Sequence, residues 1–260
     1  MSETRWYVST VHCRNGIEYK TKFPVRHSDL AVRNKERRRR EVQRADKQAR
    51  ESATVLGQEL NDNYTVGEDV HLALSIDDRA MEKIVRLAGS EERDAVLLKL
   101  ENYVARQIVN KILLPMCKEA GIPAVYHWIV SDKNGKTGEY ERPHVHMVAK
   151  KDVAALMVRA WLRKGMGEII RERVLYSHHH GDLQELADYL IGQTRGFRNK
   201  NRYHPSRAAS RPEHAAPRPS SSGNADLKLP KGCVKIYRSE FQAGRPQMLR
   251  YYRPPAEGTP

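Results

Sequence analysis

Alternation of apolar and polar residues marks three strands in the middle of the chain. In the segment VHLALSI, at 70–76, every second residue is apolar, which is the period of a strand with one buried face. Two further runs, AVYHWIVSD at 124–132 and RPHVHMVA at 142–149, are rich in β-branched and aromatic residues. Asn134-Gly135 and Gly138 lie between them, so 124–149 is predicted to form a hairpin.

An apolar residue at every third or fourth position predicts the helices. Between 91 and 119 this period predicts one long amphipathic helix, stopped by Pro115 or Gly121. The segments 153–164 and 182–191 show the same period, and Asp182 is placed to cap the second of them. A short strand is expected between these two helices, at 173–176.

The N-terminal part is predicted to hold a hairpin and a basic helix. Residues 1–27 alternate in places around Asn15-Gly16, which is typical of a short hairpin. A helix is expected to begin at Ser28 or Asp29, and residues 31–50 hold nine Lys/Arg against three acids. Such a helix is either a solvated charged element or one that lies on phosphates, and the sign of its charge favours the second.

The C-terminal part changes character at Arg195. From there to about residue 225 the chain is rich in Arg, Pro, Ser and Ala and nearly lacks large apolar residues, which predicts irregular structure. A small extended unit is expected at 231–241, followed by frayed last residues.

Charge narrows the class of protein. The 260 residues include 46 Lys/Arg and 32 Asp/Glu, a formal net charge of +14, which favours a nucleic-acid partner. No segment approaches the roughly 18 apolar residues of a membrane span, and the N-terminus lacks the apolar core of a signal peptide. Cys13, Cys117 and Cys233 are scattered singly and form neither a disulfide framework nor a zinc motif. We therefore expect a cytoplasmic protein with no membrane partner.

The densest chemical signal is the strand RPHVHMV. Residues two apart on a strand share a face, so His144 and His146 project together while Val145 and Met147 face the core. Two imidazoles on one rigid face supply half of a site for manganese, nickel or zinc. The alternative interpretation is that they are two surface histidines on a half-buried strand. A carboxylate with open positions beside it would leave room for a phosphate oxygen.

Two residues on the partner strand compete for the third ligand position. Asp132 ends that strand next to the histidine strand, and His127 lies earlier on it, where packing beside Trp128 is the commoner role. The run from His178 to His180 is expected to be a histidine-rich turn, with contact to metal or DNA as the alternative.

Tyr189 lies off the apolar stripe of the helix at 182–191. A phenolate in such a position can attack a phosphodiester when a metal polarises the phosphoryl oxygen. Helix geometry alone does not distinguish this role from that of an ordinary amphipathic tyrosine, and Tyr176 and Tyr203 are rival nucleophiles.

Taken in order, these segments resemble the rolling-circle replication initiators of the HUH endonuclease class. The likeness is closest to the replication-associated proteins of single-stranded DNA phages and of bacterial plasmids or integrative elements. It rests on NDNYTVGEDVHLALSID (61–77), RPHVHMV (142–148), LQELADYLIGQT (183–194) and the basic stretch NRYHPSRAASRPE (201–213).

The resemblance implies a role for each site residue. His144 and His146 would be metal ligands, Asp132 the third ligand where relatives usually carry glutamate, and Tyr189 the nucleophile. Relatives usually have a lysine three residues after the tyrosine, where this chain has Gly192, and Arg195 is a candidate replacement. The cofactor would be a divalent metal, Mn²⁺ or Mg²⁺.

The implied fold is α+β, with an antiparallel sheet of about five strands and packed helices, of ferredoxin-like or RRM-like type. The expected division is a basic N-terminal extension at 1–60, an HUH endonuclease domain at 61–213, and a linker with a small C-terminal extension at 214–260.

The implied activity is the initiation of rolling-circle DNA replication in a bacterial host cell. The protein would nick and join single-stranded origin DNA through a 5′-phosphotyrosine, with a host helicase and polymerase as further partners, because the chain carries no P-loop motif. DNA contacts are expected from the basic residues Arg37, Arg38, Arg39, Arg40, Arg195, Arg198, Lys200, Arg202 and Arg207. The alternatives are a relaxase or transposase of the same chemistry, or a nucleic-acid-binding protein without catalysis.

Overall fold

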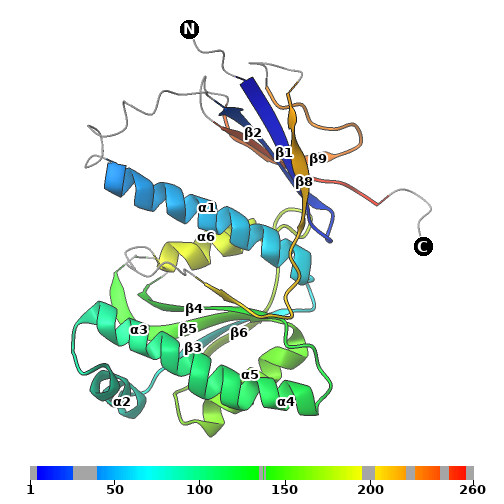
Figure 1. Cartoon of the computed structure of the whole chain (residues 1–260). Helices are drawn as coiled ribbons and strands as arrows, with labels where there is room; N and C mark the ends of the chain where they lie inside the picture. Colours follow the sequence, from blue (N-terminus) through cyan, green and yellow to red (C-terminus); the bar gives the residue numbers. More distant parts are fainter. Residues whose placement is uncertain are drawn as a thin grey trace.

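The computed structural model describes residues 5–25, 40–134, 137, 139–194, 203–220, 226–240 and 246–255. Its architecture is α+β, as expected from the sequence, but it has two five-stranded sheets instead of one. The helices α1 and α6 lie between the two sheets (Figure 1). The elements in chain order are β1 (Arg5–His12), β2 (Ile17–Val25), α1 (Arg40–Asn63), β3 (Val70–Ser75), α2 (Asp78–Ala88), α3 (Arg93–Tyr103), η2 (Val104–Leu113), α4 (Leu114–Glu119), β4 (Tyr126–Lys133), β5 (Tyr140–Ala149), α5 (Lys151–Arg163), β6 (Ile169–Val174), α6 (Gln184–Gln193), β7 (His204–Pro205), β8 (Glu213–Pro219), β9 (Val234–Arg238) and β10 (Gln247–Tyr252).

The first sheet, called the central sheet here, has the strand order β6-β3-β5-β4-β7, and all its neighbouring strands are antiparallel. The predicted strands at 70–76, 124–132 and 142–149 are its three inner strands. The expected strand at 173–176 is in fact at 169–174, where it forms one edge. The alternation at 70–76 and the β-branched and aromatic residues at 124–132 and 142–149 were sufficient to predict these strands.

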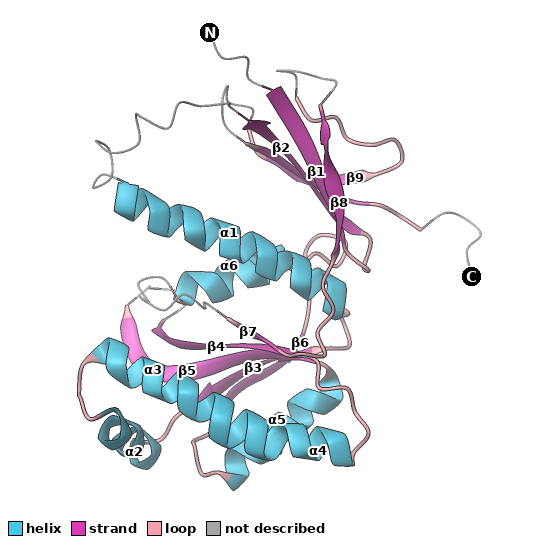
Figure 2. Ribbon diagram, viewed as in Figure 1, coloured by secondary structure: helices cyan, strands magenta, loops and turns pink. Residues whose placement is uncertain are grey.

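The two faces of the central sheet are covered differently. One face packs against α2, α3, η2, α4 and α5 around residues such as Leu72, Trp128 and Met147. The other face packs against α1 and α6 through Ile129 and Val148. Figure 2 shows these helices on opposite sides of the sheet. Side chains that alternate along one strand therefore enter two separate environments.

The long helix predicted over 91–119 is one uninterrupted helical stretch from α3 through η2 to α4. Its middle part, η2, is π-helical. Pro115 does not stop it; the proline lies at the start of α4, directly after the π-helical part. The helix ends before Gly121, whose φ of 67° lies in the left-handed region.

The second sheet, called the terminal sheet here, joins the two ends of the chain in the order β8-β1-β2-β10-β9. The predicted N-terminal hairpin is present as β1 and β2. The expectation of irregular structure after Arg195 is wrong for 213–219, which forms the edge strand β8. The inner strand β10 was not predicted, and the residues after 255 lie outside the described part of the chain. Edge strands tolerate the prolines that suggested a loop.

Buried polar contacts hold the terminal sheet together and join it to the rest. Glu18 accepts hydrogen bonds from Tyr251 Oη at 2.6 Å and Arg253 Nε at 2.5 Å. Arg250 pairs with Asp182, just before α6, at 2.6 Å. The N-terminal and C-terminal extensions expected from the sequence therefore form one sheet, which is anchored at the start of α6.

The basic helix predicted from Ser28 overlaps α1, which begins at Arg40. Residues 28–39 lie outside the described part of the chain. The second half of α1 buries Ala53, Leu56 and Leu60 in the cluster that contains α6. In the described part of the chain, no helix is both long enough and apolar enough to cross a membrane.

Candidate metal and nucleophile site

His144 and His146 lie near the middle of the central sheet, on β5. Their side chains are buried, with 5% and 4% exposure, on the face covered by α6. Their Nε2 atoms are 3.0 Å apart. Two nitrogens bound to one metal at about 2.1 Å and at right angles are separated by about 3.0 Å, so the pair has the spacing of two neighbouring ligands.

The outer nitrogens of both rings are held by other groups. His144 Nδ1 lies 3.0 Å from the carbonyl oxygen of Arg142, which can only accept, so this nitrogen carries the proton and leaves Nε2 with its lone pair. His146 Nδ1 lies 3.1 Å from Nε2 of His71. Donation from the outer nitrogen of a ligating histidine to a carbonyl or another acceptor is typical of metal sites.

Sequence reasoning missed His71. It lies on β3 at a polar position of the VHLALSI pattern, and its ring stacks on that of His146 at a centroid distance of 5.2 Å. The available signal was the alternation itself, because His71, Ala73 and Ser75 occupy the face opposite to the buried leucines.

The environment of His71 and His146 lowers the pKa of both rings and favours their neutral form. Burial lowers the pKa of His71 to about 4, with a further lowering from the positive charges of Arg171 and Arg173. Burial also lowers the pKa of His146 well below its usual value, and His71 and His144 add to the effect. A neutral imidazole is the form that binds a metal, so binding does not require loss of a proton from His146 near neutral pH.

Tyr189 faces the same histidines from α6. Its ring lies edge-on to His146 at a centroid distance of 5.7 Å and to His71 at 6.4 Å. Helix α6 is fixed by Leu183 and Leu190, which are buried in the cluster under α1. Tyr189 is itself partly buried against that cluster and lines a cavity beside His71.

The structure does not bring Asp132 together with the histidines. Ser131 is the residue of β4 opposite His144, and the pairing with β5 becomes irregular directly after it, at Asp132. The side chain of Asp132 lies against Arg93 of α3, a helix on the other face of the sheet. There it accepts hydrogen bonds from Arg93 Nε at 2.5 Å and Nη2 at 2.7 Å. The expectation of Asp132 as third ligand is corrected by this placement.

His127 shares the face of the two histidines but both its nitrogens are taken. Nδ1 lies 2.8 Å from the hydroxyl of Tyr64, and Nε2 lies 3.1 Å from Oε2 of Glu59. The side chain is 2% exposed. His127 is therefore a packed, hydrogen-bonded histidine, and its nitrogens are not available to a metal.

Gln193, which sequence reasoning also missed, reaches the site from the last residue of α6. It is 3% exposed, and its Oε1 accepts a hydrogen bond from Ser131 Oγ at 2.9 Å. Hydrogen bonding by its side chain raises the pKa of His146, against the larger lowering by burial. Its Nε2 is buried without a hydrogen-bond partner among the described residues. A single buried amide on a helix has no sequence signature.

The donor set fits a divalent metal that keeps open positions. Among the described residues, no group of three or more His, Cys, Asp and Glu is arranged to hold a metal ion. The two imidazole Nε2 atoms would supply nitrogen donors, and the side chain of Gln193, which hydrogen-bonds to His146, would bring a carboxamide beside them; nitrogen and oxygen donors together suit Mn²⁺. The remaining coordination positions would be available to substrate oxygen.

The structure also describes the histidine run at 178–180 and some of the basic residues expected to contact DNA. His180 stacks on Tyr252 of the terminal sheet at 5.1 Å, with a φ of 51°, as expected of a histidine-rich turn. His178 and His179 are exposed. Arg207 is exposed after β7, and the side chain of Arg40 is not described. The expected DNA contacts that lie outside the described residues are Arg37, Arg38, Arg39, Arg195, Arg198, Lys200 and Arg202.

We expect Asp132→Asn to lower stability and leave metal binding unchanged. The substitution removes the charge from a buried hydrogen-bonded pair, which costs about 1–3 kcal/mol of the free energy of unfolding. Urea denaturation with and without Mn²⁺ measures both quantities. A loss of the Mn²⁺-dependent increase in stability would instead return Asp132 to the metal site.

Comparison of this chain with protein families, with curated proteins and with solved structures found no match.

Proposed function

We propose that the protein is a metal-dependent endonuclease and strand transferase that nicks single-stranded DNA through a covalent tyrosine intermediate. The observation that carries the proposal is the 3.0 Å separation of the His144 and His146 Nε2 atoms, with the ring of Tyr189 edge-on to His146 at a centroid distance of 5.7 Å. The net charge of +14 supports a polyanionic substrate. The order of motifs that resembles the rolling-circle initiators points to an origin as the DNA that is cut.

The residues divide the work in this proposal. His144, His146 and Gln193 would hold a Mn²⁺ or Mg²⁺ ion, which polarises the scissile phosphate and stabilises charge on its oxygens. Tyr189 is positioned by the buried side of α6, which limits the directions from which its hydroxyl attacks. His71 keeps the ring of His146 in place through the contact at 3.1 Å.

The proposed reaction is a transesterification, so no co-reactant is consumed. The Tyr189 hydroxyl gives up its proton to solvent and forms a bond from its oxygen to phosphorus. The bond from phosphorus to the 3′ oxygen breaks, and that oxygen takes up a proton to become the free 3′ hydroxyl. Joining is the reverse reaction, with a 3′ hydroxyl attacking the phosphotyrosine.

A covalent adduct tests this proposal. We expect the full chain, incubated with a random-sequence pool of single-stranded DNA and Mn²⁺, to form a product that survives denaturation. Mass spectrometry of the linked peptide identifies the nucleophile, and sequencing of the captured strands identifies the preferred site. The absence of any adduct across Mn²⁺ and Mg²⁺ would reject the proposal.

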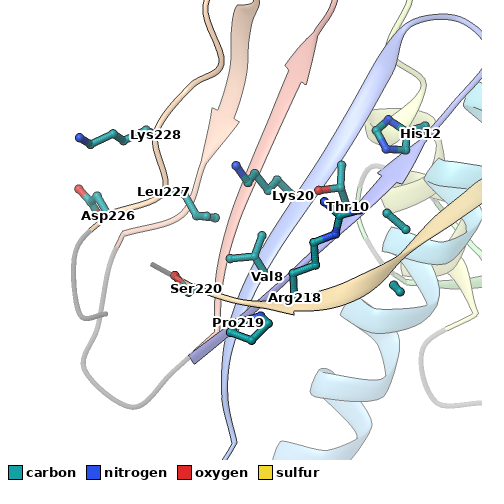
Figure 3. Close-up of a pocket in the computed structure, with 12 residues that line it drawn as sticks. Val8, Thr10, His12, Lys20, Arg218, Pro219, Ser220, Asp226, Leu227 and Lys228 are labelled. Carbon is teal, nitrogen blue, oxygen red and sulfur yellow. The ribbon is translucent and has the colours of Figure 1, made fainter. Parts of the chain in front are cut away.

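A nucleic-acid-binding protein without catalysis is the second candidate. The observation that favours it is a hollow of about 490 Å³ on the terminal sheet, whose lining includes neither His144 nor His146 (Figure 3). Lys20, Arg218 and Lys228 line it, with Asp226 as an acid among them. DNA binding with no adduct under any metal would support this candidate over the first.

Gln193 provides a direct test of the metal set. We expect Gln193→Glu to tighten Mn²⁺ binding about tenfold, because it replaces a neutral oxygen donor with a charged one. Gln193→Leu replaces the carboxamide with an apolar side chain and so removes the oxygen, and should weaken Mn²⁺ binding about tenfold. Isothermal titration calorimetry measures both. Equal affinities in the two variants would exclude Gln193 as a ligand.

A further inference from the structure

The edge strand β6 presents two arginines to the histidine face of the central sheet. Arg173 is opposite His71 and Arg171 is opposite Ala73, so both lie on the face that carries His146. Glu172, between them, points to the other face. The positive charges reach the site, because Arg171 and Arg173 both contribute to the lowered pKa of His71.

Neither arginine is neutralised by a neighbour. Both are exposed, and within the described parts of the chain neither makes an ion pair or side-chain hydrogen bond. Arginine is a bidentate donor suited to phosphate oxygens. Two unpaired arginines on one edge strand, two residues apart, therefore form a short row of phosphate-binding groups.

A cavity of about 280 Å³ lies between this strand and the start of α6. Arg171, Arg173 and Tyr189 all line it, so it connects the arginine row to the candidate nucleophile. Its volume is at the lower end of the range for small-molecule pockets, which suits one nucleotide and excludes a duplex. Unpaired bases can leave the stack and enter such a cavity, whereas paired bases cannot do so without melting.

The rim of the cavity carries an exposed aromatic ring. Tyr176 is 66% exposed and lies edge-on to His178 at a centroid distance of 5.1 Å. Exposed tyrosines are stacking platforms for the bases of single strands. Of the two acids that line the cavity, Asp182 is buried in a pair with Arg250, which leaves Glu185 as the exposed one.

We propose that this cavity is the binding site for the unpaired nucleotide next to the scissile phosphate, with Arg171 and Arg173 on the flanking phosphates and the base stacked on Tyr176. The proposal rests on the proposed function for its position in the reaction. The ligand it names is single-stranded DNA, and its recognition is by backbone charge and stacking.

Binding without metal separates this proposal from the nicking activity. We expect Arg171→Gln/Arg173→Gln to weaken binding to a 20-nucleotide single strand by about tenfold in fluorescence anisotropy. The slope of log affinity against log salt should fall by about 1.4, because each lost phosphate contact contributes about 0.7 for single strands. Tyr176→Ala should also weaken single-strand binding about tenfold, and Tyr176→Phe should not.

The matched control is Arg159→Gln/Arg163→Gln, which removes the same charge from α5 on the opposite face of the sheet. Equal losses in the two double variants, or an equal loss of affinity for duplex DNA, would overturn the proposal. A specific loss of single-strand binding together with no adduct from the unmodified chain would keep this site and reject the nicking function.

Discussion

Tyr189→Phe is expected to abolish the covalent adduct with single-stranded DNA and to leave folding and DNA binding unchanged. The substitution removes only the hydroxyl, while the ring keeps its edge-on contacts with His146 at 5.7 Å and His71 at 6.4 Å. The nucleophile must be placed accurately for in-line attack, and α6 provides this through its buried side. The loss should exceed a thousandfold, because no other group would replace the attacking oxygen. Denaturing gel electrophoresis after reaction with Mn²⁺ measures it.

Two other tyrosines are the controls for this experiment. Tyr203→Phe should keep the adduct, because Tyr203 packs beside His127, at 6.1 Å, and burial raises its pKa well above the usual range. Tyr176→Phe should also keep it, since Tyr176 is at the rim of the cavity. The position of Tyr176 at the end of a predicted strand suggests partial burial, whereas its exposure is 66%. An adduct that persists in Tyr189→Phe but not in Tyr176→Phe would move the nucleophile to Tyr176.

The inner strands and the histidine pair were predictable from sequence because one physical rule covers both. Residues two apart on a strand share a face, and Val145 and Met147 had to face the core. The rule therefore placed His144 and His146 side by side without any knowledge of the fold. The same rule would have placed His71 on this face if the polar positions of β3 had been considered as well as the apolar ones.

The prediction of Asp132 as a metal ligand failed because position along a strand does not fix which face a side chain occupies at the strand's end. The sequence indicated that Asp132 ends the neighbouring strand, but the face it occupies depends on the register of β4 against β5. The register places Ser131 opposite His144 and turns Asp132 towards Arg93 of α3, which is far from it in sequence. A shift of one residue would reverse the faces, so proximity along strands cannot identify a ligand by itself.

Neither the terminal sheet nor the position of Gln193 could be predicted from local sequence patterns, because both depend on contacts between distant segments. The sheet depends on contacts between distant segments, as in the hydrogen bond from Tyr251 to Glu18. No local pattern at either end reports the other end. Gln193 likewise acquires its position from the packing of α6 over β4, where Ser131 donates to its side chain.

His144→Ala and His146→Ala are expected to abolish both Mn²⁺ binding and cleavage. Each substitution removes one of the two nitrogens that are 3.0 Å apart, and a single imidazole with an amide oxygen holds a divalent ion weakly. Single-strand affinity should change less than twofold, because affinity resides in distributed cations such as Arg171 and Arg173. Calorimetry with Mn²⁺ and anisotropy with a single strand give the two measurements on the same preparation.

His127→Ala separates a metal ligand from a buried structural histidine. His127 is bonded to Tyr64 and Glu59, so its loss removes two buried hydrogen bonds and lowers the free energy of unfolding by about 1–3 kcal/mol. Tyr64 keeps its hydrogen bond to the carbonyl of Val148, and Glu59 keeps that from Arg211. Mn²⁺ binding should persist in this variant once it is folded, whereas it is lost in His144→Ala at nearly unchanged stability. If His127→Ala lost Mn²⁺ binding and His144→Ala kept it, the metal would lie further along β4, and the pairing of Tyr189 with the β5 histidines would carry no catalytic meaning.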